Sequence, residues 1–161
     1  MVKTFFFGFV SLLLLSACVT KEERAAQLAE TMQRVSRSVA DQHYKIDVQS
    51  MSPSRGGHRQ VSYGFFLEVK GDTLVSYLPY FGRAYSVPYG GSGKGLNFTE
   101  HIKEYSSEQT KKGQTLIRMR VENEEDNYLF TIYIYDSGQA TINLRARERE
   151  SISYSGELHT L

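Results

Sequence analysis

Alternation of apolar and polar residues, repeated between short polar turns, constrains the fold of this chain more than any other feature. Successive side chains of a β-strand point to opposite faces, so a period of two gathers the apolar residues on one face. One run with this period is Val61, Tyr63, Phe65, Leu67 and Val69. The same period recurs over residues 44–48, 117–121 and 128–134. The pattern predicts a series of antiparallel strands joined by hairpins.

The turns between these segments predict which residues of neighbouring strands lie opposite one another. A two-residue loop at residues 71–72 pairs Val69 with Leu74 and Phe65 with Leu78, so the turn and the apolar pattern agree on one register. The turn at residues 111–113 predicts one further pair, Tyr105 with Met119.

The turn at residues 136–138 allows two registers. A two-residue loop would set Phe130 opposite Arg145, which places a charge against an apolar side chain. A three-residue loop with Gly138 in the left-handed conformation pairs apolar residues throughout. These pairs are Ile134 with Ala140, Ile132 with Ile142, and Phe130 with Leu144. We therefore expect the three-residue loop.

Residues 20–43 have the period of a helix instead. Their apolar stripe consists of Leu28, Met32, Val35 and Val39, at spacings of three and four residues. Thr20 and Glu23 have the spacing of a capping box at its start. We expect the stripe to pack on the β domain, and the alternative is that it binds a partner.

The first 18 residues are typical of an export signal. Lys3 precedes an apolar run over residues 5–15, which is shorter than the roughly 20 residues of a membrane-spanning helix. The segment ends in Leu-Ser-Ala followed by Cys18, which resembles the lipobox of bacterial lipoproteins, in which the Cys thiol takes a diacylglyceryl group. Cys18 is the only cysteine, and lipidation accounts for an odd cysteine in an exported chain. Several acyl chains on one residue give stable membrane anchoring.

These patterns together predict a mainly β protein with one N-terminal amphipathic helix. About eight antiparallel strands form a meander that closes as a barrel, lipocalin-like in outline, or folds as a two-layer sandwich. The expected organisation is a lipoprotein signal peptide over residues 1–17, the lipidated Cys and helix over 18–43, and the β domain over 44–161. No Asp follows Cys18 directly, which favours the outer membrane of a Gram-negative cell, on the periplasmic face or the cell surface.

The central part of the chain resembles a known family. Residues 68–74, the aromatic and Gly-rich stretch 77–98, the turn 123–126 and the closing stretch 151–156 are similar to the domain of unknown function 4251 family of exported lipoproteins from Bacteroidetes-type bacteria. The resemblance implies an envelope lipoprotein. It implies no activity, substrate or catalytic residue, so the function stays open.

The stretch 77–98 also contains the candidate site. Aromatic rings beside cationic donors suit stacking on sugar faces or enclosing a small apolar ligand, and glycines let the backbone approach a ligand closely. The candidate ligand-binding residues are Tyr77, Tyr80, Phe81, Arg83, Tyr85, Tyr89, Lys94 and Phe98. The alternative is that these rings fill the barrel and bond their hydroxyls internally.

Other classes of function find little support in the sequence. The 19 Lys and Arg residues include Lys3, so the chain without residues 1–17 carries 18 basic and 18 acidic groups, which argues against nucleic-acid binding. Lys94 is followed by Gly95 rather than Ser or Thr, so the Gly-rich run is no P-loop. The histidines have no metal-ligand spacing, and no nucleophile elbow is present. We expect no enzyme, cofactor or metal.

The sequence therefore predicts a non-enzymatic envelope protein, bound to the membrane through Cys18. In the first hypothesis it binds a small apolar molecule or a glycan through the aromatic segment. In the alternative it is a structural or assembly module that docks on another envelope protein. A row of arginines on the outer face, including Arg118 and Arg145, is interpreted as a solvated face or as a patch for an anionic glycan or an acidic partner.

Overall fold

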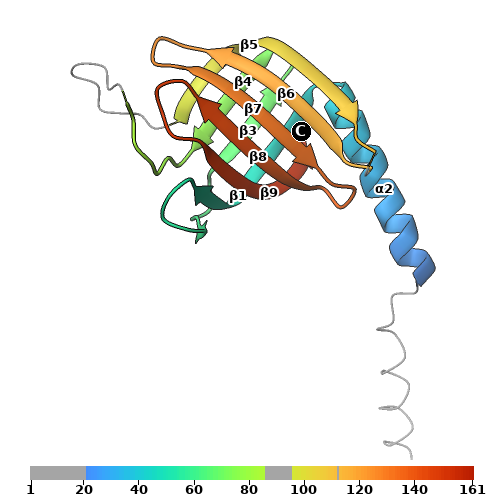
Figure 1. Ribbon diagram of the computed structural model, residues 1–161. Coiled ribbons are helices and arrows are strands. Elements are labelled where there is room, and N and C mark those ends of the chain that lie inside the picture. The colour runs from blue at the N-terminus through green and yellow to red at the C-terminus, as the bar shows by residue number, and fades with distance from the viewer. Residues whose placement is uncertain (1–20, 86–95, 112) are drawn as a thin grey trace, which may run out of the picture.

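Eight antiparallel strands close into a barrel in the computed structural model, which describes residues 21–85, 96–111 and 113–161 (Figure 1). The elements are α2 (Lys21–Ala40), β1 (His43–Pro53), β2 (Arg59–Gln60), β3 (Phe66–Lys70), β4 (Thr73–Leu78), β5 (Leu96–Gln109), β6 (Thr115–Glu122), β7 (Asn127–Ile134), β8 (Gln139–Ala146) and β9 (Ile152–Thr160). From β3 to β9 each strand pairs with its neighbours in sequence, and the two-residue β2 pairs on the side with β1. The predicted meander is confirmed, and it is a barrel rather than a sandwich.

The barrel closes through β1 and β9, which pair from Tyr44–Thr160 to Pro53–Ile152. The register shifts by one residue between Val48 and Ser50, where a β-bulge bends β1. Gly156 lies against this bulge, and a Cβ at residue 156 would lie 2.9 Å from the carbonyl carbon of Asp47. Only glycine therefore allows the two backbones to approach as closely as they do.

The turns have the registers expected from their residues. Val69 lies opposite Leu74, and the β3–β4 ladder then ends at Phe66–Tyr77, one pair short of the expected partners Phe65 and Leu78. All three expected pairs around residues 136–138 form, and Tyr105 lies opposite Met119. Gly138 has φ 85° and Gly113 has φ 77°, so both turns use glycine in the left-handed region.

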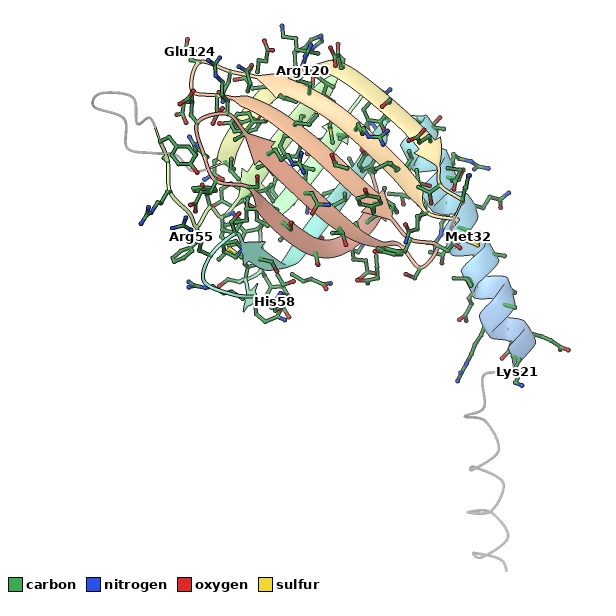
Figure 2. All side chains as sticks on the ribbon, viewed as in Figure 1. Lys21, Met32, Arg55, His58, Arg120 and Glu124 are labelled. Atoms are coloured by element: carbon green, nitrogen blue, oxygen red, sulfur yellow. The ribbon has the colours of Figure 1, made fainter. Side chains whose placement is uncertain are left out.

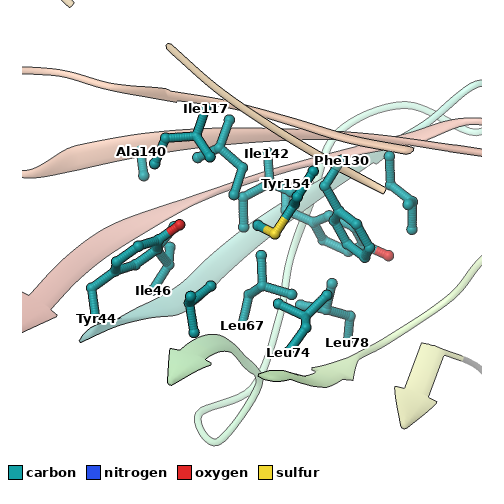
Figure 3. Close-up of a cluster of buried hydrophobic side chains, with 14 of the residues drawn as sticks. Tyr44, Ile46, Leu67, Leu74, Leu78, Ile117, Phe130, Ala140, Ile142 and Tyr154 are labelled. Carbon is teal, nitrogen blue, oxygen red and sulfur yellow. The ribbon is translucent and has the colours of Figure 1, made fainter. Parts of the chain in front are cut away.

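Side chains fill the inside of the barrel. Figure 3 shows apolar side chains from opposite walls meeting in one cluster. The largest fully buried side chains are Tyr44, Tyr128, Tyr154, Phe130, Ile46, Leu67, Leu74, Leu78, Leu96, Ile117, Met119 and Ile132. An eight-stranded barrel has an interior just wide enough for its own side chains to fill, and here they do so.

Helix α2 packs on the barrel with only part of its apolar stripe. Val35 and Val39 are buried, and the Tyr105 hydroxyl donates a hydrogen bond to the Val39 carbonyl at 3.5 Å. Leu28 and Met32 are 45% and 40% exposed, because the first half of the helix extends beyond the barrel (Figures 1 and 2). The expected packing is thus found for the C-terminal half of the stripe.

The helix ends earlier than expected. The sequence pattern extends to residue 43, whereas α2 ends at Ala40 and β1 begins at His43. Gln42 has φ 51°, a left-handed conformation that ends the helix and turns the chain into β1. No helix within the described ranges is long and apolar enough to cross a bilayer. The predicted signal peptide and Cys18 lie outside the described residues.

Candidate functional site

The two ends of the barrel differ in the length of their connections. Because the strands alternate in direction, every second turn lies at the same end. The turn end, next to α2, has short connections at residues 71–72, 110–114 and 135–138. The opposite end, called the loop end here, has its described connections at residues 54–65, 79–85, 123–126 and 147–151. Figure 1 shows residues 79–85 on the opposite side of the barrel from α2. Loops on a rigid scaffold are where binding residues concentrate.

Two tyrosine hydroxyls hold the segment that leaves β4 at the loop end. Tyr154 is buried and donates to the carbonyl of Pro79 at 2.8 Å. The Tyr80 hydroxyl lies 2.9 Å from the carbonyl oxygen of Arg83 and 3.1 Å from that of Glu150, and donates to them. Burial raises the pKa of both hydroxyls above the usual value, so both stay protonated donors.

The same segment pairs with the connection between β8 and β9. The Glu150 amide donates to the Arg83 carbonyl at 3.0 Å, and the Tyr85 amide donates to the Glu148 carbonyl at 2.7 Å. Between these bonds Ala84 forms an isolated bridge to Arg149. Residues 83–85 are therefore held against the adjacent connection as a short strand would be.

A buried carboxylate joins the connection before β7 to the connection before β9. The Asp126 side chain is fully buried and accepts from the backbone amides of Asn127 at 2.7 Å, Arg147 at 2.8 Å and Glu148 at 3.1 Å. Its second oxygen lies 3.8 Å from Arg149 Nε, whose guanidinium also lies 2.6 Å from Glu125. Asp126 thus satisfies the backbone of two connections at once.

Sequence reasoning missed this carboxylate. Residues 123–127 read as a polar turn, and alternation does not distinguish a buried acid from a solvated one. The available signal is an acid directly before a strand, where a carboxylate accepts backbone N–H groups of its own turn. The partners at Arg147 and Glu148 are 21 and 22 residues away, so no local pattern reveals them.

The part of the loop end formed by residues 55–59 and 81–85 is aromatic and cationic. The Arg59 guanidinium lies 3.9 Å from the centroid of the Phe81 ring, a cation–π contact, and Phe81 is 45% exposed. Tyr85 is 67% exposed. Arg55 pairs with Glu150 at 3.5 Å, where the arginine side chain is 70% exposed and the glutamate 10%. The acid is therefore mostly covered and the arginine faces solvent; Figure 2 labels Arg55 at this end of the barrel.

The structure distributes the candidate residues over three places. Tyr80, Phe81, Arg83 and Tyr85 lie at the loop end, on the segment after β4. Tyr77 is 46% exposed on the outer face of β4, stacked on Phe65 with 5.5 Å between ring centroids. The predicted residues Tyr89 and Lys94 lie outside the described residues.

Phe98 faces the barrel interior from β5. It lies opposite the buried Ser76, and its ring stacks on Tyr128 at 4.8 Å between centroids. With Tyr77, Phe98 borders an open hollow of about 430 Å³ in the outer wall, which includes none of the four candidate residues of the segment 79–85. The described members of the candidate set therefore do not converge on one cavity.

Metal-binding clusters are not seen in the described part of the chain. Within residues 21–85, 96–111 and 113–161, no three His, Cys, Asp or Glu side chains gather so as to hold a metal ion.

The protein is a small up-and-down β-barrel of eight strands that follows an N-terminal helix. Its interior is filled, and its long loops lie at one end. Residues 26–158 match the family described as domain of unknown function (DUF4251), and the chain belongs to this family. A similar solved structure is a crystal structure of a DUF4251 family protein from Bacteroides eggerthii DSM 20697. It has a TM-score of 0.62 and 12% sequence identity over 82% of this chain and 89% of that one. No curated protein matches the chain. The sequence resemblance is confirmed, and the shared property is the fold.

Proposed function

We propose that this protein is a non-enzymatic, lipid-anchored protein of the Gram-negative cell envelope that docks on another envelope protein through the loop end of its barrel. The observation that carries the proposal is the contrast between a filled interior and a structured, exposed loop end. A barrel that carries a ligand keeps a cavity inside its walls, whereas this interior is occupied by its own side chains. A binding partner would therefore be recognised by the outer surface of the protein.

The position of the predicted anchor supports this orientation. A lipid on Cys18 would lie three residues before Lys21, where α2 begins. The 20-residue helix extends over about 30 Å and joins the barrel at the turn end. An anchor there leaves the loop end free to face away from the lipid. An anchor on either face of the membrane, periplasmic or outward, is compatible with this orientation.

The chemistry of the loop end supports a protein partner. Aromatic residues and arginine are enriched in protein interfaces and in their hot spots. Phe81 exposes its ring beside Arg59, Tyr85 exposes its ring on the same segment, and the acid paired with Arg55 is nearly buried. The backbone beneath them is held by the hydrogen bonds of Tyr80, so little order has to be gained on binding. We infer that the partner presents an acidic surface with an apolar centre.

A second candidate function is binding of a small apolar molecule or a glycan by the aromatic segment. The exposure of Phe81 and Tyr85 favours it, because exposed rings stack on sugar faces. Such a ligand would lie on the surface of the loop end rather than inside the barrel. The experiment below distinguishes the two candidates.

We expect a photo-crosslinking amino acid at Tyr85 to trap one discrete protein adduct in cells of the native host. The matched control places it at Tyr135, which is 39% exposed at the turn end. The adduct should be absent from Tyr135 and should weaken about tenfold or more when Arg83→Glu reverses a loop-end charge, because an interface charge pair is lost. Immunoblotting of irradiated membranes measures both effects.

Two outcomes would contradict docking. The same adducts from Tyr85 and Tyr135 would show collision without a specific surface. Absence of any protein adduct at Tyr85, together with a crosslinked small molecule detected by mass spectrometry of the Tyr85 peptide, would favour the second candidate.

The anchor is tested separately by Cys18→Ser. Since Cys18 is the only cysteine, this change removes the acylated thiol without breaking a disulfide. We expect the wild-type protein in the membrane fraction, with acyl chains on Cys18 by mass spectrometry. The variant should leave the membrane fraction or keep an uncleaved signal peptide. A wild-type protein with unmodified Cys18 would refute the anchor and leave the barrel proposal unaffected.

A further inference from the structure

A second surface feature lies in the barrel wall, on the outer face of the sheet. Strands β6 to β9 enclose an open hollow of about 490 Å³ on their outer face. This wall hollow is bordered by Arg118, Thr131, Tyr133, Asn143, Arg145 and Ser153, among others. Its volume lies within the range of roughly 300–1,000 Å³ that is usual for ligand pockets.

The hollow follows from the order of residue sizes across the sheet. Arg118 lies opposite Thr131, Thr131 opposite Asn143, and Asn143 opposite Ser153, so one row crosses four strands. The short side chains of the row form a floor on β7, β8 and β9, with Arg118 at its edge. Arg145 rises from the next position of β8 on the same face. The hollow thus forms where long side chains surround a row of short side chains.

The polar groups of the hollow are mainly donors. The Ser153 hydroxyl donates to Asn143 Oδ1 at 2.7 Å, which leaves the amide N–H groups of Asn143 without a bond among the described residues. The Arg145 side chain is exposed, and its guanidinium has no ion pair or hydrogen bond with any described residue, whereas Arg118 pairs with Glu108 at 2.7 Å. None of the residues that border the hollow is acidic. A ligand that matches it carries negative charge and many acceptors.

We propose that the wall hollow binds a carboxylate-bearing sugar of an acidic glycan. The Arg145 guanidinium offers two parallel N–H donors to a carboxylate, a geometry that lysine does not provide. The Asn143 amide and the hydroxyl of Thr131 suit sugar hydroxyls, and the Tyr133 ring supplies an apolar face at the side. The proposal does not depend on the docking residues of the loop end, since the hollow reaches that end only at Ser151.

An acidic peptide would also match the positive charge of the hollow, but it fits the hollow less well. Extended peptides add to a free sheet edge or insert apolar side chains into pockets. Strands β6 to β9 are paired on both sides within the closed barrel, so the wall hollow has no free edge. Its floor consists of hydroxyl and amide groups, which match a hydroxyl-rich ligand.

The test is calorimetric titration of the mature, detergent-solubilised protein with three probes. These are oligogalacturonate, oligomannuronate and a sialylated oligosaccharide, and the methyl ester of whichever binds serves as the neutral control. We expect at least one acid to bind and its ester to bind at least about tenfold more weakly, because the charged hydrogen bonds are lost. Arg145→Gln should weaken the same acid by a similar factor.

Arg147→Gln is the matched control, because it removes the same charge two residues away at an exposed position of the loop end. It should change the affinity by no more than about twofold, since Arg147 does not border the hollow and its charge is already paired with Glu148. Three outcomes overturn the proposal: no binding of any acidic probe, equal binding of acid and ester, or equal losses in the two arginine variants. Thermal unfolding of both variants verifies that each is folded, which is expected for two exposed side chains.

Discussion

Gly156→Ala is expected to destabilise the barrel by about 3 kcal/mol, the upper range for overpacking in a closed interior. A Cβ at residue 156 would overlap the carbonyl oxygen of Asp47 and lie 3.1 Å from the Cα of Val48. These atoms belong to backbone, so no side-chain rotation relieves the overlap. The strands themselves must separate, and they are β1 and β9, whose pairing closes the barrel.

Urea unfolding followed by far-ultraviolet circular dichroism and tyrosine fluorescence measures this loss, since the chain has no tryptophan. Gly57→Ala is the control. Gly57 has φ 75°, and a Cβ there would meet nothing within 4 Å. The Gly57→Ala variant should lose only about 1 kcal/mol of its free energy of unfolding, the cost of an alanine in the left-handed conformation. If the two variants lost the same free energy of unfolding, the close approach of β1 and β9 would be wrong.

Local features of the fold were predictable because they depend on neighbours in sequence. The registers at residues 71–72 and 136–138 follow from turn geometry and from which side chains must face inward. Closure was not predictable, because β1 and β9 are the most distant strands of the meander. Alternation alone fits a barrel and a sandwich equally well. Gly156 is the decisive residue for closure, yet nothing around it in the sequence marks a close approach of backbones.

The extent to which the helix is buried could not be predicted from the sequence either. The spacing of the four stripe residues indicates one apolar face, and it contains no information about how far the barrel surface extends along the helix. Val35 and Val39 meet that surface, whereas Leu28 and Met32 lie beyond it. The extent of burial is a property of the assembled fold.

The candidate site was predicted from clustering in sequence, and strand geometry separates such clusters. Tyr77 and Leu78 are adjacent on β4, so one faces solvent and the other the core. The period of two at Leu74, Ser76 and Leu78 contains this information, and it would have removed Tyr77 from a common pocket. The exposed rings at the loop end follow no such period, so their placement required the structure.

The order of the loop end depends on Asp126, and Asp126→Asn is expected to lower the free energy of unfolding by about 3 kcal/mol. The change keeps the shape and removes the charge. The asparagine oxygen can still accept the amides of Asn127 and Arg147, as a neutral and weaker acceptor. The NH₂ group takes the place of Oδ2, so the Glu148 amide loses its second acceptor and Arg149 loses a buried anionic neighbour. Arg149 keeps its ion pair with Glu125 at 2.6 Å, so the cost comes mainly from the charge-assisted hydrogen bonds that the buried carboxylate loses.

Hydrogen exchange gives a second, local measurement of the same variant. The amides of residues 147 and 148 should lose protection first, because their charged acceptor becomes neutral while the barrel ladders remain. Glu124→Gln is the control in the same turn. Glu124 is exposed, so Glu124→Gln should change the free energy of unfolding by no more than about 0.5 kcal/mol. Unchanged exchange at residues 147 and 148 in Asp126→Asn would show that Asp126 does not hold this connection. If exchange there rises and crosslinking from Tyr85 falls with it, the loop end acts as one preorganised surface, because residues 83–85 bond directly to the connection that Asp126 holds.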